Sequence, residues 1–116
     1  MPFFVKESAR VDVVNQYRWY LEQGVPDVAE RFAVAFDTCI DFIMQFPGAG
    51  ASKRLENIQA NGLRSWPIDG FPQLKMYYIM REDVLTIVRV LHSKRDVMSI
   101  LENETVEDSL TIKYNA

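Results

Sequence analysis

The sequence is poor in the residues on which metal centres, disulfide frameworks and most nucleophilic active sites depend. Its 116 residues include a single cysteine, Cys39, and a single histidine, His92. One cysteine excludes a disulfide within the chain, and sites built from several Cys and His ligands lack their donors. Cys39 occupies an apolar position of a helical pattern, which is typical of a buried structural thiol. We therefore expect neither a metal nor a cofactor.

Long hydrophobic runs are also missing. No stretch approaches the roughly 18 apolar residues of a membrane span. The first seven residues lack the basic start and the long apolar run of an export signal. With 48% hydrophobic and 25% charged residues, the composition is ordinary for a globular domain. A chain of this length buries enough surface to fold without disulfides or bound metals. We expect a cytoplasmic protein that makes no membrane contact.

The chain has no excess of positive charge, although its charge is unevenly distributed. A net charge of −3 argues against a generic nucleic-acid binder. Residues 52–95 nevertheless carry eight Lys and Arg against four acids. Residues 7–46 carry three Arg against seven acids, and residues 96–116 carry one Lys against five acids. Any anionic target must therefore meet the middle segment.

The first half of the chain predicts a strand and two helices. Residues 3–6 form a short apolar-led run that predicts a strand, and Ser8 follows as an expected helix N-cap. Apolar residues then recur at helical spacing over about 9–23, with Gly24 ending that helix. A second, cleaner apolar stripe predicts a helix over 26–46, begun by a proline. The short turn between the two helices predicts an antiparallel hairpin.

The second half changes to the period of strands. Residues 47–62 are expected to be a loop, with a helical turn possible over 53–59. Strands are expected over 63–67, 74–80 and 84–92, the last two joined by a polar turn at 81–83. The near-continuous apolar run of 84–92 indicates a central strand. A short helix is expected over 96–101.

The C-terminal tail leaves two alternatives open. Residues 102–104 are acidic, and Leu110, Ile112 and Tyr114 then alternate with polar residues. The alternation favours an edge strand slightly over disorder. Taken together, the order β-α-α-β-β-β predicts an α+β fold in which a helical hairpin packs on a small antiparallel sheet.

No specific enzyme motif is present, but one group of basic residues near strand ends is a candidate site. Arginines there could hold a phosphate and offset charge that develops on it, and a histidine beside them could move a proton. The alternative for Arg64 and Arg89 is an internal ion pair with Glu56, Asp69 or Asp96, and both interpretations stay open. The candidate target-binding residues are Arg64, Arg89, His92, Lys94 and Arg95.

Four aromatic residues suggest base stacking, with core packing as the alternative. Phe32 and Phe36 lie on the cleanest apolar stripe, so packing in the core is favoured for both. Trp66 stands beside a proline at a strand end, and Trp19 lies on the first predicted helix. An exposed apolar patch would be a docking site for a partner chain.

Four segments in the same order resemble the RelE/ParE toxin superfamily, most closely its ParE-type plasmid-stabilisation branch. They are Pro26–Phe32, Phe46-Pro47 with the glycines that follow, Gly62–Phe71, and Val88–Asp96 with its RVLH…RD pattern. The resemblance covers about residues 3–101. We therefore divide the chain into a toxin domain, 1–103, and an acidic extension, 104–116.

The resemblance implies a bacterial growth-inhibiting toxin that a cognate antitoxin neutralises by wrapping its surface. ParE-like members inhibit DNA gyrase, which is our first hypothesis. RelE-like members are ribosome-dependent endoribonucleases that cut messenger RNA, which is the second hypothesis and the only one that makes the chain an enzyme. A ParE-like interaction domain that has lost toxicity, with the extension covering its functional surface, is the third.

The resemblance also assigns candidate catalytic residues if the chain is a ribonuclease. Arg64 and Arg89 fall where ribonuclease members place catalytic arginines, and His92 lies close to their acid/base position. The aromatic acid/base that several ribonuclease members carry after the last strand has no equivalent here, since Ser93, Asp96 and Val97 occupy that stretch. An acidic chain also departs from the strongly basic character of a ribosome-docking protein.

Overall fold

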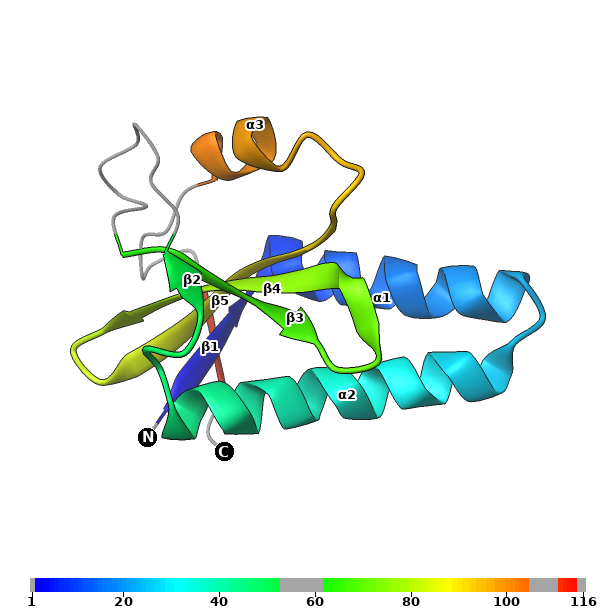
Figure 1. Cartoon of the computed structure of the whole chain (residues 1–116), viewed down its shortest axis with the longest axis horizontal. Coiled ribbons are helices and arrows are strands. Elements are labelled where there is room, and N and C mark those ends of the chain that lie inside the picture. Colours follow the sequence, from blue (N-terminus) through cyan, green and yellow to red (C-terminus); the bar gives the residue numbers. More distant parts are fainter. Residues whose placement is uncertain (1, 53–61, 105–110, 115–116) are drawn as a thin grey trace.

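The computed structural model describes residues 2–52, 62–104 and 111–114, which contain three helices and six strands (Figure 1). No helix in these ranges is long and apolar enough to span a membrane. In chain order the elements are β1 (Phe3–Lys6), α1 (Glu7–Glu22), α2 (Pro26–Gln45), β2 (Ala51–Ser52), β3 (Arg64–Ile68), β4 (Phe71–Arg81), β5 (Val84–His92), α3 (Val97–Glu102) and β6 (Thr111–Tyr114).

The strands form one sheet in the order β2-β3-β4-β5-β1-β6. The prediction of a purely antiparallel sheet is wrong in one respect, because β1 pairs with β5 in parallel while the other neighbouring strands are antiparallel. A parallel pair needs a long connection, and the helical hairpin with β2 to β4 supplies it. β5 lies between β4 and β1, so the prediction of a central strand is confirmed.

Helices cover both faces of this sheet (Figure 1). The α1–α2 hairpin packs on one face, where Phe32 and Tyr78 belong to the main core. α3 covers the other face, where Leu101 packs with Tyr77 and Leu91. The α+β class and the helical hairpin on a sheet are therefore confirmed.

α2 follows its apolar stripe closely. Pro26 occupies its first turn, and the helix ends at Gln45, one residue earlier than expected. Cys39 is 5% exposed, and burial raises the pKa of its thiol to about 12, so the thiol stays protonated. The prediction of a buried structural cysteine is confirmed. The buried residues of the helix are Ala29, Phe32, Phe36, Cys39, Ile40 and Ile43.

α1 is less buried than its apolar pattern predicts, since Val14 and Leu21 are 37% and 46% exposed. The helix begins at Glu7 directly after β1, so the prediction of Ser8 as N-cap is wrong. Lys6 takes that position without a capping side-chain hydrogen bond. Ser8 lies within the first turn, and its hydroxyl donates to the Glu104 carboxylate at 3.1 Å. The Ser8 hydroxyl therefore binds Glu104, which is distant in the sequence, instead of capping the helix.

The β4–β5 turn is one residue shorter than expected. Arg81 pairs with Val84, which leaves Glu82 and Asp83 as a two-residue turn. Both have positive φ, 52° and 64°, as a type I′ turn requires. Two acidic residues do not give the usual Asn-Gly or Asp-Gly signal, so the sequence alone does not predict this turn type.

Three smaller features complete the fold. The expected loop 47–62 contains β2, which pairs with β3, while the possible helical turn over 53–59 lies outside the described residues. α3 begins one residue later than expected, because the Asp96 carboxylate caps it by accepting from the Ser99 backbone N–H at 3.3 Å. β6 pairs with β1, which confirms the strand interpretation of the tail for residues 111–114.

Gly50 marks a close approach between the segment after α2 and the sheet. Its N–H donates to the Tyr78 hydroxyl at 3.0 Å, and an added Cβ would lie 2.5 Å from that oxygen and 2.8 Å from the Ser65 carbonyl oxygen. We expect Gly50→Ala to lower the free energy of unfolding by about 1–3 kcal/mol, as overpacking does. Urea denaturation measures this, with Gly48→Ala as control because its Cβ meets nothing within 4 Å. Equal effects of the two substitutions would contradict the close approach.

Candidate functional site

The two candidate catalytic arginines lie on opposite faces of the sheet. Arg64 of β3 is in register with Tyr78, which belongs to the core under the helical hairpin. Arg89 of β5 is in register with Tyr77, which packs on the α3 side. Because paired residues share a face while successive residues alternate, the sheet itself separates the two guanidinium groups. This arrangement does not favour one phosphate bound by both guanidinium groups.

Arg64 holds the chain segment that follows α2. Its Nη1 donates to the Gly50 carbonyl oxygen at 2.8 Å and more weakly to the Gly48 carbonyl oxygen at 3.4 Å. On the same segment, the Tyr78 hydroxyl donates to the Pro47 carbonyl oxygen at 2.8 Å. Arg64 and Tyr78 therefore fix this segment on the sheet, a structural role that does not require an anionic ligand.

Arg89 belongs to a buried ion network, which we define as Lys6, Asp12, Arg89 and Glu104. Arg89 donates from Nε and Nη2 to the two Asp12 carboxylate oxygens at 2.7 and 2.8 Å, and from Nη1 to Glu104 Oε1 at 2.9 Å. Lys6 Nζ lies 2.8 Å from Glu104 Oε2. Two positive and two negative groups therefore neutralise one another, with side chains only 7–15% exposed.

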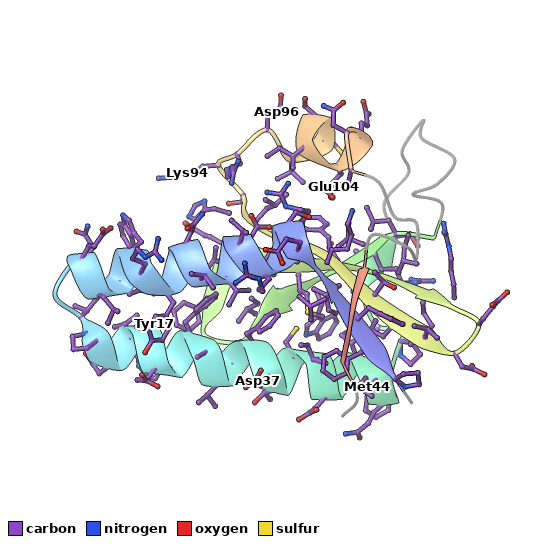
Figure 2. All side chains as sticks on the ribbon, turned by 180° about the vertical axis from the view of Figure 1, so that it is seen from behind. Tyr17, Asp37, Met44, Lys94, Asp96 and Glu104 are labelled. Carbon is purple, nitrogen blue, oxygen red and sulfur yellow. The ribbon has the colours of Figure 1, made fainter. Side chains whose placement is uncertain are left out.

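The network confirms an internal ion pair for Arg89, but with partners other than those predicted. Asp12 and Glu104 bind it instead of Glu56, Asp69 or Asp96. Asp12 reaches the strand because α1 crosses β5, and its carboxylate also accepts the Val90 backbone N–H at 2.9 Å. Glu104 arrives from the end of α3, beneath that helix (Figure 2). Both partners come from distant segments, which a search along the sequence does not identify.

The pKa directions agree with a network that stays charged. Burial raises the pKa of Glu104. Hydrogen bonds and charges from Lys6 and Arg89 lower this pKa by more, so the net shift is downward. The hydrogen bond to Asp12 raises the pKa of Arg89 despite its burial. Arg89 could bind a phosphate only by leaving Asp12, and a buried carboxylate without a partner is costly.

His92, by contrast, lies at an open part of the surface. With Lys94 it borders a hollow of about 600 Å³ between α1 and the neighbouring ends of β4 and β5, which we call the β5-end hollow. The Nδ1 atom of His92 accepts the Lys94 backbone N–H at 3.0 Å, which favours the tautomer that carries its hydrogen on Nε2. The hollow is lined by Gln16, Trp19, Tyr20, Phe71, Pro72, Gln73, Leu74, His92 and Lys94.

Two backbone contacts fix the rim of the hollow. The Ser93 N–H donates to the Gln73 carbonyl oxygen at 2.8 Å, which ties the turn after β5 to β4. The Arg95 N–H donates to the His92 carbonyl oxygen at 3.1 Å. Arg95 is exposed beside the hollow but is not one of its lining residues. Of the five predicted basic residues, the structure thus brings together His92, Lys94 and Arg95.

The aromatic residues divide between the core and the hollow. Phe32 and Phe36 are buried, which confirms core packing for both. Trp66 stacks on Phe42, with ring centroids 4.9 Å apart. Trp19 is 50% exposed and lines the hollow. An exposed tryptophan on a helix was the available sequence signal for this site, whereas the contribution of the first residues of β4 has no signal in the sequence.

Comparison with protein families matches residues 3–97 to the family described as ParE toxin of type II toxin-antitoxin system, parDE. A search of curated proteins finds no match. The matched range contains every lining residue of the β5-end hollow and three members of the buried ion network. Glu104, the fourth member, lies beyond it.

The buried ion network predicts a large cost for removing Arg89. Arg89→Ala leaves Asp12, whose side chain is 7% exposed, without its charged partner. We expect a loss of about 3–5 kcal/mol in the free energy of unfolding. Arg10→Ala, which removes an exposed pair with Glu7, is the control and should cost no more than about 1 kcal/mol. Urea denaturation compares them, and equal losses would show that the network contributes little.

The lowered pKa of Glu104 predicts a loss of stability on the acid side. A carboxylate whose pKa is depressed by folding stabilises the protein above its unfolded pKa, and this contribution is lost as the pH falls through the folded value. The wild-type protein should therefore lose its advantage over Glu104→Gln as the pH falls below the ordinary value of 4.5. Unfolding free energies measured from neutral pH downward test this. Glu22→Gln, an exposed substitution of the same chemistry, should run parallel to wild type throughout.

Proposed function

This chain belongs to the ParE toxin family of type II toxin–antitoxin systems, and we propose that it arrests growth by inhibiting DNA gyrase. As a member of this family it is a toxin component and has an antitoxin as partner. Inhibition of gyrase, and a contribution to plasmid stabilisation, are our proposals from its resemblance to the ParE-type branch. Inhibition would proceed by binding, without a chemical step carried out by the toxin.

The observation that best supports this proposal is that the Arg89 guanidinium is already bound by two carboxylates. Cleavage of RNA without a metal needs cations that converge on one phosphate and are free to bind it. Arg89 is instead held by Asp12 and Glu104, and Arg64 lies across the sheet from it, bonded to backbone carbonyl oxygens. This arrangement favours a toxin that binds a protein target over one that cuts RNA.

A ribosome-dependent ribonuclease remains the second candidate because of His92. The side chain lies at the end of β5 with Lys94 and Arg95 in the same turn, so a proton-transfer group and two cations are close together at the surface. In this version of the hypothesis Arg64 and Arg89 have structural roles. His92 then becomes the residue on which RNA cleavage depends.

The third candidate, a non-toxic interaction domain, requires the C-terminal extension to cover the functional surface. The described parts of the extension lie elsewhere. Glu104 is bound by Lys6 and Arg89, and β6 pairs with the edge of β1. Neither is among the residues that line the β5-end hollow, which supports an accessible hollow and a toxic chain.

Induction of the chain in a bacterium that lacks the antitoxin distinguishes the three candidates. We expect growth arrest with a DNA-damage response and with intact messenger RNA. Codon-positioned message cleavage that His92→Ala abolishes would establish the ribonuclease instead, and the absence of any arrest would favour the interaction domain. His92→Ala is preferred to Arg89→Ala here, because loss of the buried ion network would also remove activity by unfolding the protein.

A further inference from the structure

We propose that the toxin binds its target through the β5-end hollow. The bound part of the target is a protein segment that carries a carboxylate beside an aromatic or aliphatic side chain. The proposal rests on the proposed function in taking the target to be a protein. It assigns recognition of the target to residues other than Arg64 and Arg89. Its centre is Trp19, with Lys94 at the rim.

Trp19 is a preorganised apolar anchor. Its ring meets Tyr20 edge-on with centroids 5.4 Å apart, and Tyr20 lies 5.8 Å from Phe71. Phe71 in turn meets Phe32, which is completely buried in the core. The row of rings therefore connects an exposed tryptophan to the rigid interior. Large aromatic side chains held in this way are the usual anchors of protein interfaces, because little entropy is lost when a partner covers them.

The charge around the hollow selects the partner. Among the residues that the structure describes, none that lines the hollow is acidic, although the chain as a whole carries a net charge of −3. The basic groups are His92 and Lys94, with Arg95 in the same turn. Lys94 projects from the connection between β5 and α3, on the α1 side of the molecule (Figure 2). A carboxylate on the partner would complement this rim while an apolar neighbour covers Trp19.

A protein segment fits these features better than a nucleic acid. Binding a phosphate backbone requires a row of cations that follows several phosphates, together with a favourable overall charge. Here the described lining includes one lysine and one histidine, together with the aromatic residues Trp19, Tyr20 and Phe71. One carboxylate and one apolar side chain fill such a site, so recognition of a folded protein surface or a short peptide is the better match.

Two substitutions test the hollow, one directed at its exposed aromatic residue and one at its positive charge. Trp19→Ala removes the exposed anchor, and Lys94→Glu reverses the charge at the rim. The matched controls are Phe46→Ala, an aromatic residue that is 55% exposed, and Arg31→Glu, a charge reversal at an exposed position of α2. Each variant of the full chain is induced without antitoxin, purified with the cognate antitoxin, and heated to determine its melting temperature.

We expect Trp19→Ala and Lys94→Glu each to weaken growth arrest by about tenfold or more, the scale of an interface hot spot. Both should keep the wild-type melting temperature and antitoxin binding, and the two controls should arrest growth like wild type. Undiminished arrest by both variants would overturn the proposal. Variants that remain toxic but escape the antitoxin would also overturn it, because the hollow would then bind the antitoxin.

The same experiment separates this inference from the proposed function. If the wild type arrests growth without inhibiting gyrase, the gyrase proposal fails, while a dependence of arrest on Trp19 and Lys94 still supports the hollow as the target surface. If arrest proceeds through gyrase but is unchanged in both variants, only the hollow is overturned. A wild-type chain that causes no arrest would overturn both.

Discussion

The fold depends on the neutralisation of four buried charges at the point where β1, α1, β5 and the end of α3 meet. Lys6, Asp12, Arg89 and Glu104 come from these four elements, and each would be costly to bury alone. Their mutual contacts fix where α1 crosses the sheet and where the chain leaves α3. The arrangement also explains why the acidic residues Asp12 and Glu104 lie so close to β5, a strand of the basic middle segment.

The same network divides that basic segment into residues that build the protein and residues that face outward. Arg64 hydrogen-bonds to backbone carbonyl oxygens of the chain after α2, and Asp12 and Glu104 neutralise Arg89, so both guanidinium groups are held by contacts within the fold. His92 and Lys94 follow at the end of β5 and border the hollow. A count of charges along the sequence overstates what a partner meets, because it cannot separate the two groups.

Much of the fold could be predicted from local patterns, and the errors have physical causes. The stripe of α2 and the apolar run of β5 report burial directly, and both were predicted well. Ser8 was misplaced because its partner, Glu104, is 96 residues away. The parallel β1–β5 pairing and the ionic partners of Arg89 depend on tertiary packing in the same way. In the candidate site, His92 and Lys94 were found from the sequence and Trp19 was named as a candidate aromatic residue, but the contribution of the first residues of β4 was not predicted.

The position of β1 has a consequence for synthesis on the ribosome. Among the strands that the structure describes, β1 is made before the others, yet both strands that flank it, β5 and β6, are made after β2, β3 and β4. The bond between Lys6 and Glu104 likewise joins residues 98 positions apart. Pairings between segments so far apart in the sequence cannot form until the chain between them has emerged, and such topologies fold slowly. A nascent chain that stops before Val84 has neither neighbour for its first strand, so incomplete products of translation cannot assemble the toxin's sheet.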